Sequence, residues 1–145
     1  MPEEAQLPLT VGAFMTPTPH VIGFDQTLAE AARIMGENAV RHLPVLRDDR
    51  IVGVLSDRDI AIVESLGATH PDAIRVAEAM TPVPYCVPPD MRLDRVVQSM
   101  CTNKYGCAIV IDDATQTVLG VFTVTDALRL LDRLLGEADE PAGNG

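Results

Sequence analysis

The fold is decided by the stretch Gly53-Val54-Leu55-Ser56-Asp57-Arg58-Asp59 and by its second copy, Gly120-Val121-Phe122-Thr123-Val124-Thr125-Asp126. Each copy is a short apolar run that ends in Ser or Thr, with an Asp three residues later and an apolar helical pattern after it. This order predicts a strand that leads directly into a helix. The hydroxyl and the carboxylate should therefore both lie at the start of that helix.

A hydroxyl and a carboxylate at a helix start have two interpretations. Ser56 with Asp59, and Thr123 with Asp126, have the spacing of a capping box, which stabilises a helix and binds nothing. The same place also suits a ligand, because the first N–H groups of a helix lack partners and its dipole is positive there. A phosphate is favoured at such a position, and a neighbouring carboxylate favours a sugar diol. The occurrence of two copies strengthens the second interpretation.

The two copies belong to a repeat that runs through most of the chain. Val11-Gly12-Ala13-Phe14-Met15-Thr16-Pro17 matches Val76-Ala77-Glu78-Ala79-Met80-Thr81-Pro82, and the same shift continues through the following strand, helix and strand. The second half then has a short insertion around Thr115-Gln116, in a predicted hairpin turn, where insertions are tolerated. The chain is therefore a duplication of one structural unit.

The repeat divides the chain into residues 9–68, a linker at 69–75, residues 76–135 and an acidic tail at 136–145, which we expect to be disordered. The first unit should have strands at 20–22, 43–46 and 51–55 and helices at 27–38 and 57–66, with Thr27 and Glu30 as a capping box. The second unit should have strands at 86–87, 108–111 and 118–122 and helices at 93–102 and 124–135.

Each predicted β-α-β-β-α unit has only three short strands, too few to bury both faces of its sheet. We therefore expect an α/β (α+β) fold in which the two units pack sheet to sheet about a pseudo-twofold axis. The cleft between two such sheets would expose both strand-to-helix junctions.

The composition argues against several classes of function. A net charge of -10 repels nucleic-acid backbones, and an aromatic content of 3% leaves few rings for bases to stack on. The 3 cysteines and 3 histidines give neither a disulfide framework nor a structural zinc signature. The N-terminus is acidic where a signal peptide is basic, and no apolar run has the length of a membrane span. We expect a cytoplasmic protein that binds no nucleic acid and no membrane.

The ordered motifs resemble a tandem pair of cystathionine β-synthase (CBS) domains, the Bateman module, over about residues 9–135. The resemblance rests on the Met-Thr-Pro openings, on D-x-x-L before the first helix of each copy, on Arg41-His42-Leu43-Pro44-Val45, and on G-h-h-[S/T]-x-x-D in both copies. It implies a stand-alone, bacterial-type regulatory protein that binds AMP, ADP or ATP, forms a homodimer and acts on an unidentified client protein in trans. The family also binds S-adenosylmethionine and NAD, which are the alternative ligands.

The resemblance also assigns roles to individual residues. Asp59 and Asp126 would hold the ribose hydroxyls of two adenosine ligands, and Ser56 and Thr123 would hydrogen-bond their phosphates. Apolar residues would flank the adenine, namely those near Ile22 and Val87 and those near Leu43 and Ala108.

Basic residues distinguish the two halves. Arg41 and His42 stand just before a buried strand, where folding does not require a basic pair. The resemblance implies that both residues contact phosphates. In the alternative interpretation, Arg41 is only solvated and His42 caps the edge of the sheet. Their equivalents in the second half are Gly106 and Cys107, so we expect two unequal sites. Further candidates are Arg58 at the first site and, as partial substitutes at the second, Lys104 and Tyr105.

Two other classes of function stay open. In a ligand-free interaction or scaffold module, the two S/T-x-x-D motifs would act only as caps. An enzyme has little support, because the sequence has no nucleophile–base pair, metal cluster or P-loop, and Asp57 and Asp59 do not share a helix face.

The last predicted helix carries a stripe of leucines at helical spacing, which indicates core or a dimer interface. These residues are Leu128, Leu131, Leu134 and Leu135. The sequence does not decide between head-to-head and head-to-tail dimers.

Overall fold

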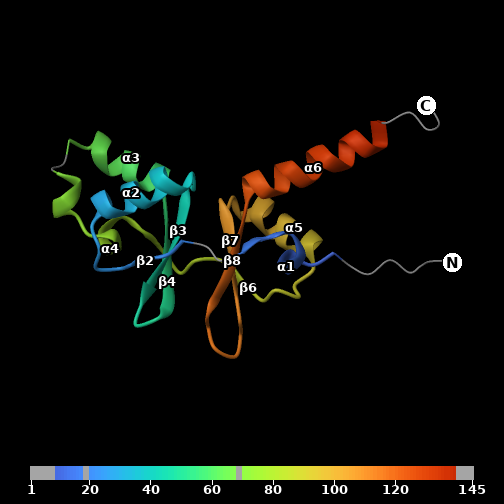
Figure 1. The fold of residues 1–145 in the computed structure, drawn as a ribbon, viewed down its shortest axis with the longest axis horizontal. Coiled ribbons are helices and arrows are strands. Elements are labelled where there is room, and N and C mark those ends of the chain that lie inside the picture. The colour runs from blue at the N-terminus through green and yellow to red at the C-terminus, as the bar shows by residue number, and fades with distance from the viewer. Residues whose placement is uncertain (1–8, 18–19, 68–69, 140–145) are drawn as a thin grey trace.

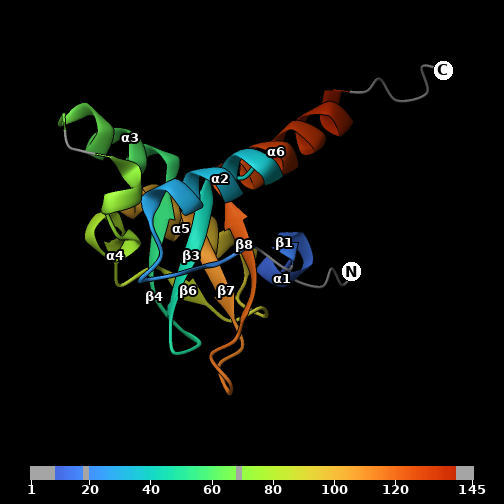
Figure 2. The same cartoon turned by 60° about the vertical axis from the view of Figure 1, so that its left-hand side comes forward.

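The computed structural model describes residues 9–17, 20–67 and 70–139 (Figure 1). The chain forms two four-stranded sheets that face each other, with helices on their outer sides (Figures 1 and 2). Each sheet combines parallel and antiparallel pairs. The predicted mixed class, with sheet packed on sheet, is confirmed.

The first sheet has the strand order β2-β3-β4-β5. These strands are β2 (Ile22–Gly23), β3 (His42–Arg47), β4 (Arg50–Ser56) and β5 (Thr81–Pro82). Helix α2 (Leu28–Asn38) connects the parallel strands β2 and β3, and α3 (Asp57–Ser65) follows β4 without a loop. The 3-10 helix η1 (Pro71–Ala73) and the short helix α4 (Val76–Ala79) precede β5.

The second sheet repeats this arrangement in the order β6-β7-β8-β1. Its strands are β6 (Cys86–Val87), β7 (Cys107–Ile111), β8 (Val118–Thr123) and β1 (Thr16–Pro17). Helix α5 (Leu93–Asn103) connects the parallel strands β6 and β7, α6 (Val124–Asp139) follows β8 directly, and α1 (Val11–Phe14) precedes β1. The two sheets are therefore equivalent strand for strand, as a pseudo-twofold axis requires.

Each sheet takes one of its two edge strands from the opposite repeat. Strand β1, at the start of the first repeat, pairs with β8 of the second, and β5, at the start of the second repeat, pairs with β4 of the first. The short helices cross as well, because Val11 is buried in the second core and Val76 in the first. We did not expect α1, β1, α4 or β5, since elements of two to four residues show too little periodicity in the sequence.

Three clusters of buried side chains hold this arrangement together. One lies beneath α2 and α3 around Leu28, Leu43 and Leu55, and an equivalent cluster lies beneath α5 around Val96 and Phe122. The third cluster joins the two sheets, because residues of β7 and β8 pack against Ile51 and Val54 of β4. The residues from β7 and β8 are Cys107, Ile109, Ile111 and Val121. This third cluster is the sheet-to-sheet contact that fixes the two halves.

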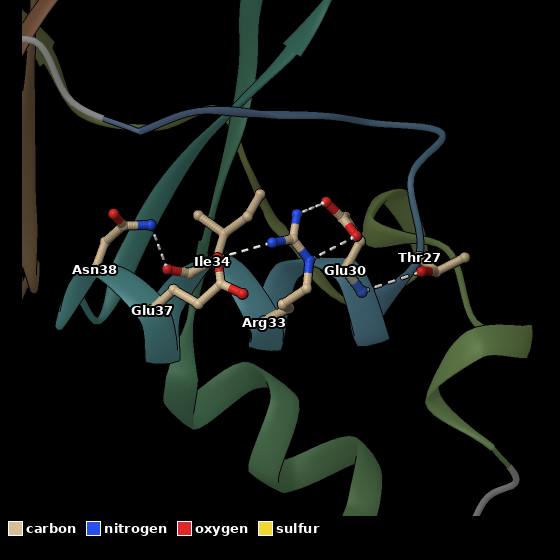
Figure 3. Close-up of polar contacts among 6 residues, drawn as sticks. All are labelled: Thr27, Glu30, Arg33, Ile34, Glu37 and Asn38. Atoms are coloured by element: carbon tan, nitrogen blue, oxygen red, sulfur yellow. Dashed lines mark hydrogen bonds and ion pairs between the residues drawn. The ribbon is translucent and has the colours of Figure 1, made fainter.

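The start of helix α2 differs in one detail from the predicted Thr27–Glu30 capping box. The Oγ1 of Thr27 accepts a hydrogen bond of 3.2 Å from the Glu30 backbone N–H, as expected for an N-cap. The Glu30 carboxylate does not return to Thr27, because it pairs with Arg33 one turn later (Figure 3). Arg33 also reaches the Glu37 carboxylate at 2.8 Å, so its guanidinium joins two turns of the exposed face. The second half of this predicted capping box is therefore wrong.

Helix α6 is longer than predicted. It continues past Leu135 to Asp139, and it extends away from the two sheets (Figure 1). The single Gly136 costs only about 1 kcal/mol in a helix, and Glu137 and Ala138 after it favour the helical state. Residues 140–145 of the predicted tail lie outside the described residues. Among the helices of the described ranges, none is long and apolar enough to cross a membrane.

Candidate functional site

The first strand-to-helix junction is a complete capping box. The Asp59 backbone N–H donates to Ser56 Oγ at 3.1 Å, and the Ser56 N–H donates to Asp59 Oδ2 at 2.9 Å. The capping interpretation is thus confirmed as local structure. It uses one carboxylate oxygen, and within the described ranges Asp59 Oδ1 accepts no protein hydrogen bond. A ligand can use this oxygen without disturbing the cap.

Two of the predicted basic residues lie beside this junction. His42 is opposite Ser56 in the β3–β4 register, and the Arg41 carbonyl accepts a 3.0 Å hydrogen bond from the Asp57 N–H at the start of α3. Burial lowers the pKa of His42 below its usual 6.5, the carboxylates of Asp57 and Asp59 oppose this shift, and the charge of Arg41 adds to it. Arg58, on the first turn of α3, is exposed. The structure therefore places Arg41, His42 and Arg58 around one helix start.

His42 also contacts the opposite half of the molecule. A Cβ atom built on Gly106 would lie 3.0 Å from His42 Nε2, so the imidazole packs over the bare backbone at that position. Gly106 is the repeat equivalent of Arg41. The two halves are consequently unequal for a steric reason, because a side chain at position 106 would displace the imidazole.

The second junction forms the same capping box, but its Asp126 carboxylate has more contacts within the protein than Asp59 has. The Asp126 N–H donates to Thr123 Oγ1 at 3.1 Å, and the Thr123 N–H donates to Asp126 Oδ2 at 2.9 Å. The hydroxyl of Thr16, from the exchanged strand β1, donates to Asp126 Oδ1 at 3.3 Å, and Arg129 Nη1 is 3.9 Å from the same oxygen. Both carboxylate oxygens of Asp126 are thus already used.

An open cleft of about 450 Å³ lies beside Asp126, between α6 and α1. Its lining residues are Phe14, Asp126, Arg129, Leu130, Asp132 and Arg133. The cleft is open to solvent, and four of its six lining residues are charged. We predicted only Asp126 among these residues; the spacing of Arg129 and Arg133 from Asp126 along one helix was the available signal, while the contribution of Phe14 depends on the strand exchange.

The predicted base-contacting residues lie in the cores. Ile22, Val87, Leu43 and Ala108 each expose 4% of their surface or less. Tyr105 stacks on Tyr85 with ring centroids 4.9 Å apart, and Lys104 ends α5 in a left-handed conformation with φ of 59°. These residues do not line the 450 Å³ cleft, and their contact with a base stays a prediction. Within the described ranges, no group of three or more His, Cys, Asp or Glu residues could hold a metal ion.

Comparison with known families identifies the fold. The model of the CBS domain matches residues 11–65 and again 76–133. These two matches cover most of the chain, one in each repeat. The chain therefore belongs to the CBS domain family and carries a pair of these domains.

Curated relatives match only with part of their own length. An uncharacterized protein of Methanocaldococcus jannaschii, MJ1232, is 29% identical over 105 residues, which cover 72% of this chain and 33% of that protein. A homoserine O-acetyltransferase of Methanosphaerula palustris is 32% identical over 114 residues, which cover 78% of this chain and 22% of the enzyme. The chain thus spans a third or less of the length of these relatives.

Solved structures resemble the chain over nearly its whole length. AcuB of Vibrio cholerae, a proposed acetoin utilization protein, has a TM-score of 0.77 and 25% identity over 93% of this chain and 100% of that one. CBSX2 of Arabidopsis thaliana, solved in complex with AMP, has a TM-score of 0.72 and 27% identity over 87% and 98%. The CBS domain pair of MJ0100, solved with 5′-methylthioadenosine and S-adenosyl-L-methionine, is 23% identical and shows likeness of fold alone.

Proposed function

We propose that this protein is a regulatory module that binds an adenine nucleotide at its strand-to-helix junctions and performs no reaction on it. The observation that carries the proposal is the carboxylate of Asp59, which caps α3 with Oδ2 and keeps Oδ1 for a ligand. Three basic residues, Arg41, His42 and Arg58, surround the same helix start. Similarity to CBSX2, which was solved with AMP, supports a ligand of this class.

Each residue of the first junction has a role in this proposal. Asp59 accepts hydrogen bonds from the ribose hydroxyls, while Ser56 and the first N–H groups of α3 donate to a phosphate. The cations of Arg41 and Arg58 offset the phosphate charge within a protein whose net charge is -10. His42, whose pKa is lowered by burial, contributes a hydrogen bond from its imidazole. Ile22 and Leu43, and Val87 at the second junction, contact the base only if the side chains that cover them move.

We propose that the first junction is the tighter of the two. At the second junction, a ribose must replace the hydrogen bond from Thr16 and the ion pair with Arg129 before it can use Asp126. Thr123 then has the role that Ser56 has at the first junction.

The response to the nucleotide passes through contacts between the two halves and then through a homodimer. His42 packs over Gly106, and Thr16 donates a hydrogen bond to Asp126, so each junction is bordered by residues of both sequence repeats. The dimer forms through the exposed apolar face of α6, which comprises Val124, Leu128, Leu131 and Leu135. The occupied dimer acts on a client protein in trans, and its cytoplasmic location stays a prediction.

The decisive experiment is thermal unfolding against AMP, ADP, ATP, NAD and S-adenosylmethionine. A ligand that binds only the folded state raises the midpoint by mass action. We expect a selective rise with an adenine nucleotide in the wild type and in the control Asp113→Asn. The rise should be clearly smaller in Asp59→Asn, which keeps an oxygen for the cap and leaves the second junction unchanged. A panel without any shift would overturn the proposal and favour the ligand-free interaction module.

A further inference from the structure

We infer that the second junction binds a nucleoside monophosphate whose phosphate is held by Arg129 and Arg133 of α6. These arginines take the place that Arg41 and His42 have at the first junction. The inference rests on the proposed function, because it concerns the ligand of the second of its two junctions.

The strand start of the second half cannot supply a cation. Gly106 has no side chain, and any side chain there would meet His42, while Cys107 is buried with 6% of its surface exposed. A phosphate near Asp126 must therefore find its positive charges on another element.

Helix α6 provides these positive charges on the face that carries Asp126. Asp126, Arg129 and Arg133 follow one another at three and four residues, which places them on one side of the helix. All three line the 450 Å³ cleft, and Phe14 of α1 closes its other side. The cleft thus combines a carboxylate for a ribose diol, two guanidinium groups for a phosphate, and apolar surface on Phe14 and Leu130 for a base.

Both arginines are available to a ligand. The contact of Arg129 with Asp126 is long, at 3.9 Å, and the Arg129 side chain is 77% exposed, so a surface pair of this kind costs little to exchange. The described part of the chain gives Arg133 no ion pair within 4.0 Å. Guanidinium groups bind phosphate through two parallel hydrogen bonds, which suits a terminal phosphate at the edge of an open cleft.

The charges of the cleft select for a single phosphate. Asp126 and Asp132 balance Arg129 and Arg133, so the four side chains together carry no net charge. A triphosphate would bring several negative charges against two carboxylates, whereas one phosphate matches the arginine pair. The first half lacks this arrangement, because the equivalent positions on α3 and at its end hold Ile62 and Leu66.

The test is titration calorimetry with AMP and with adenosine in an Asp59→Asn background, which isolates the second junction. Adding Arg129→Gln and Arg133→Gln should weaken AMP binding by about tenfold or more, since each removes a charge-assisted hydrogen bond. Adenosine binding should stay unchanged, because adenosine has no phosphate. The control pair Arg50→Gln and Arg95→Gln makes the same charge change on exposed residues elsewhere and should leave AMP binding unchanged.

Three outcomes would overturn the inference. They are the absence of AMP binding in the Asp59→Asn background, an equal loss of AMP and adenosine binding in the arginine variant, and an equal loss in the control pair. Circular dichroism on every variant excludes unfolding as the cause. The proposed function fails separately, since it requires that the wild type respond to a nucleotide, whichever residues hold the phosphate.

Discussion

The sulfur of Met15 occupies space that a side chain at position 120 would need. A Cβ atom on Gly120 would lie 2.5 Å from Met15 Sδ and 2.7 Å from the carbonyl oxygen of Thr16. Gly53 has the same relationship with Met80, at 2.5 Å. Each methionine of a Met-Thr-Pro opening thus packs on the glycine that begins the strand-to-helix motif of the other half, which explains why the two motifs recur together.

Substitution of these glycines should destabilise the protein. Gly120→Ala forces Met15 or the β1 backbone to move, and overpacking of this kind costs about 1–3 kcal/mol. Gly36→Ala is the matched control, because nothing lies within 4 Å of the added Cβ and the change should stabilise α2 by about 0.5–1 kcal/mol. Urea unfolding of the three proteins measures both effects, and equal midpoints for Gly120→Ala and wild type would contradict the packing argument.

His42 should make stability depend on pH. Burial lowers its pKa in the folded state below the usual 6.5, so the unfolded chain binds more protons between the two values. The free energy of unfolding should therefore fall as the pH drops below 6.5 through the folded-state pKa. Chemical denaturation between about pH 5 and 7.5 should show this fall in the wild type and a shallower one in His42→Gln; identical slopes would exclude His42 as the cause.

The three cysteines should differ in reactivity. Burial raises the pKa of Cys107 to about 12, helped by the charge of the nearby Cys86 thiolate, and burial also raises the pKa of Cys86. Cys101 is exposed on α5. Since the thiolate is the reactive form, a short treatment with iodoacetamide near pH 8 should modify Cys101 first. Mass spectrometry of peptides locates the label, and early labelling of Cys107 in folded protein would show that the third cluster opens.

The exposed face of α6 should determine the oligomeric state. Leu128 and Leu131 are 58% and 48% exposed, although both are large aliphatic residues. Replacing both with Asp should convert a dimer into a monomer of 15.6 kDa, as measured by light scattering after size-exclusion chromatography. The control Val83→Asp changes a residue that is 89% exposed in a loop and should leave the mass unchanged. A wild-type monomer would exclude this interface.

The longer elements of the fold could be predicted because they depend on local patterns. Helices α2, α3 and α5 begin where the apolar spacing begins, and the strand pairs β3–β4 and β7–β8 follow from short apolar runs around a turn. The exchange of β1 and β5 could not be predicted from any local pattern, because it depends on contacts such as that of Thr16 with Asp126, 110 positions later. Sequence similarity between the halves does not show which half a segment packs against.

The candidate site was predictable to a similar extent. Ser56 with Asp59 and Thr123 with Asp126 could be predicted as helix starts, since the motif itself encodes the capping box. The inequality of the two halves also followed from comparing Arg41 with Gly106. The arginines of α6 were missed because exposed arginines on a helix are usually only solvated, and their significance depends on Phe14, which the strand exchange brings beside them.

The exchanged strands also affect how the protein is made on the ribosome. The first sheet can close soon after Thr81 and Pro82 are synthesised, because all its other strands precede them. Strand β1 precedes every other strand of the described residues, yet its partner β8 is the last of them, so β1 cannot pair until Val118–Thr123 have been synthesised. Since domains generally fold from the N-terminus as they emerge, the two repeated halves should complete their folding in sequence, and a nascent chain stalled before Val118 would have a complete first sheet and an incomplete second sheet.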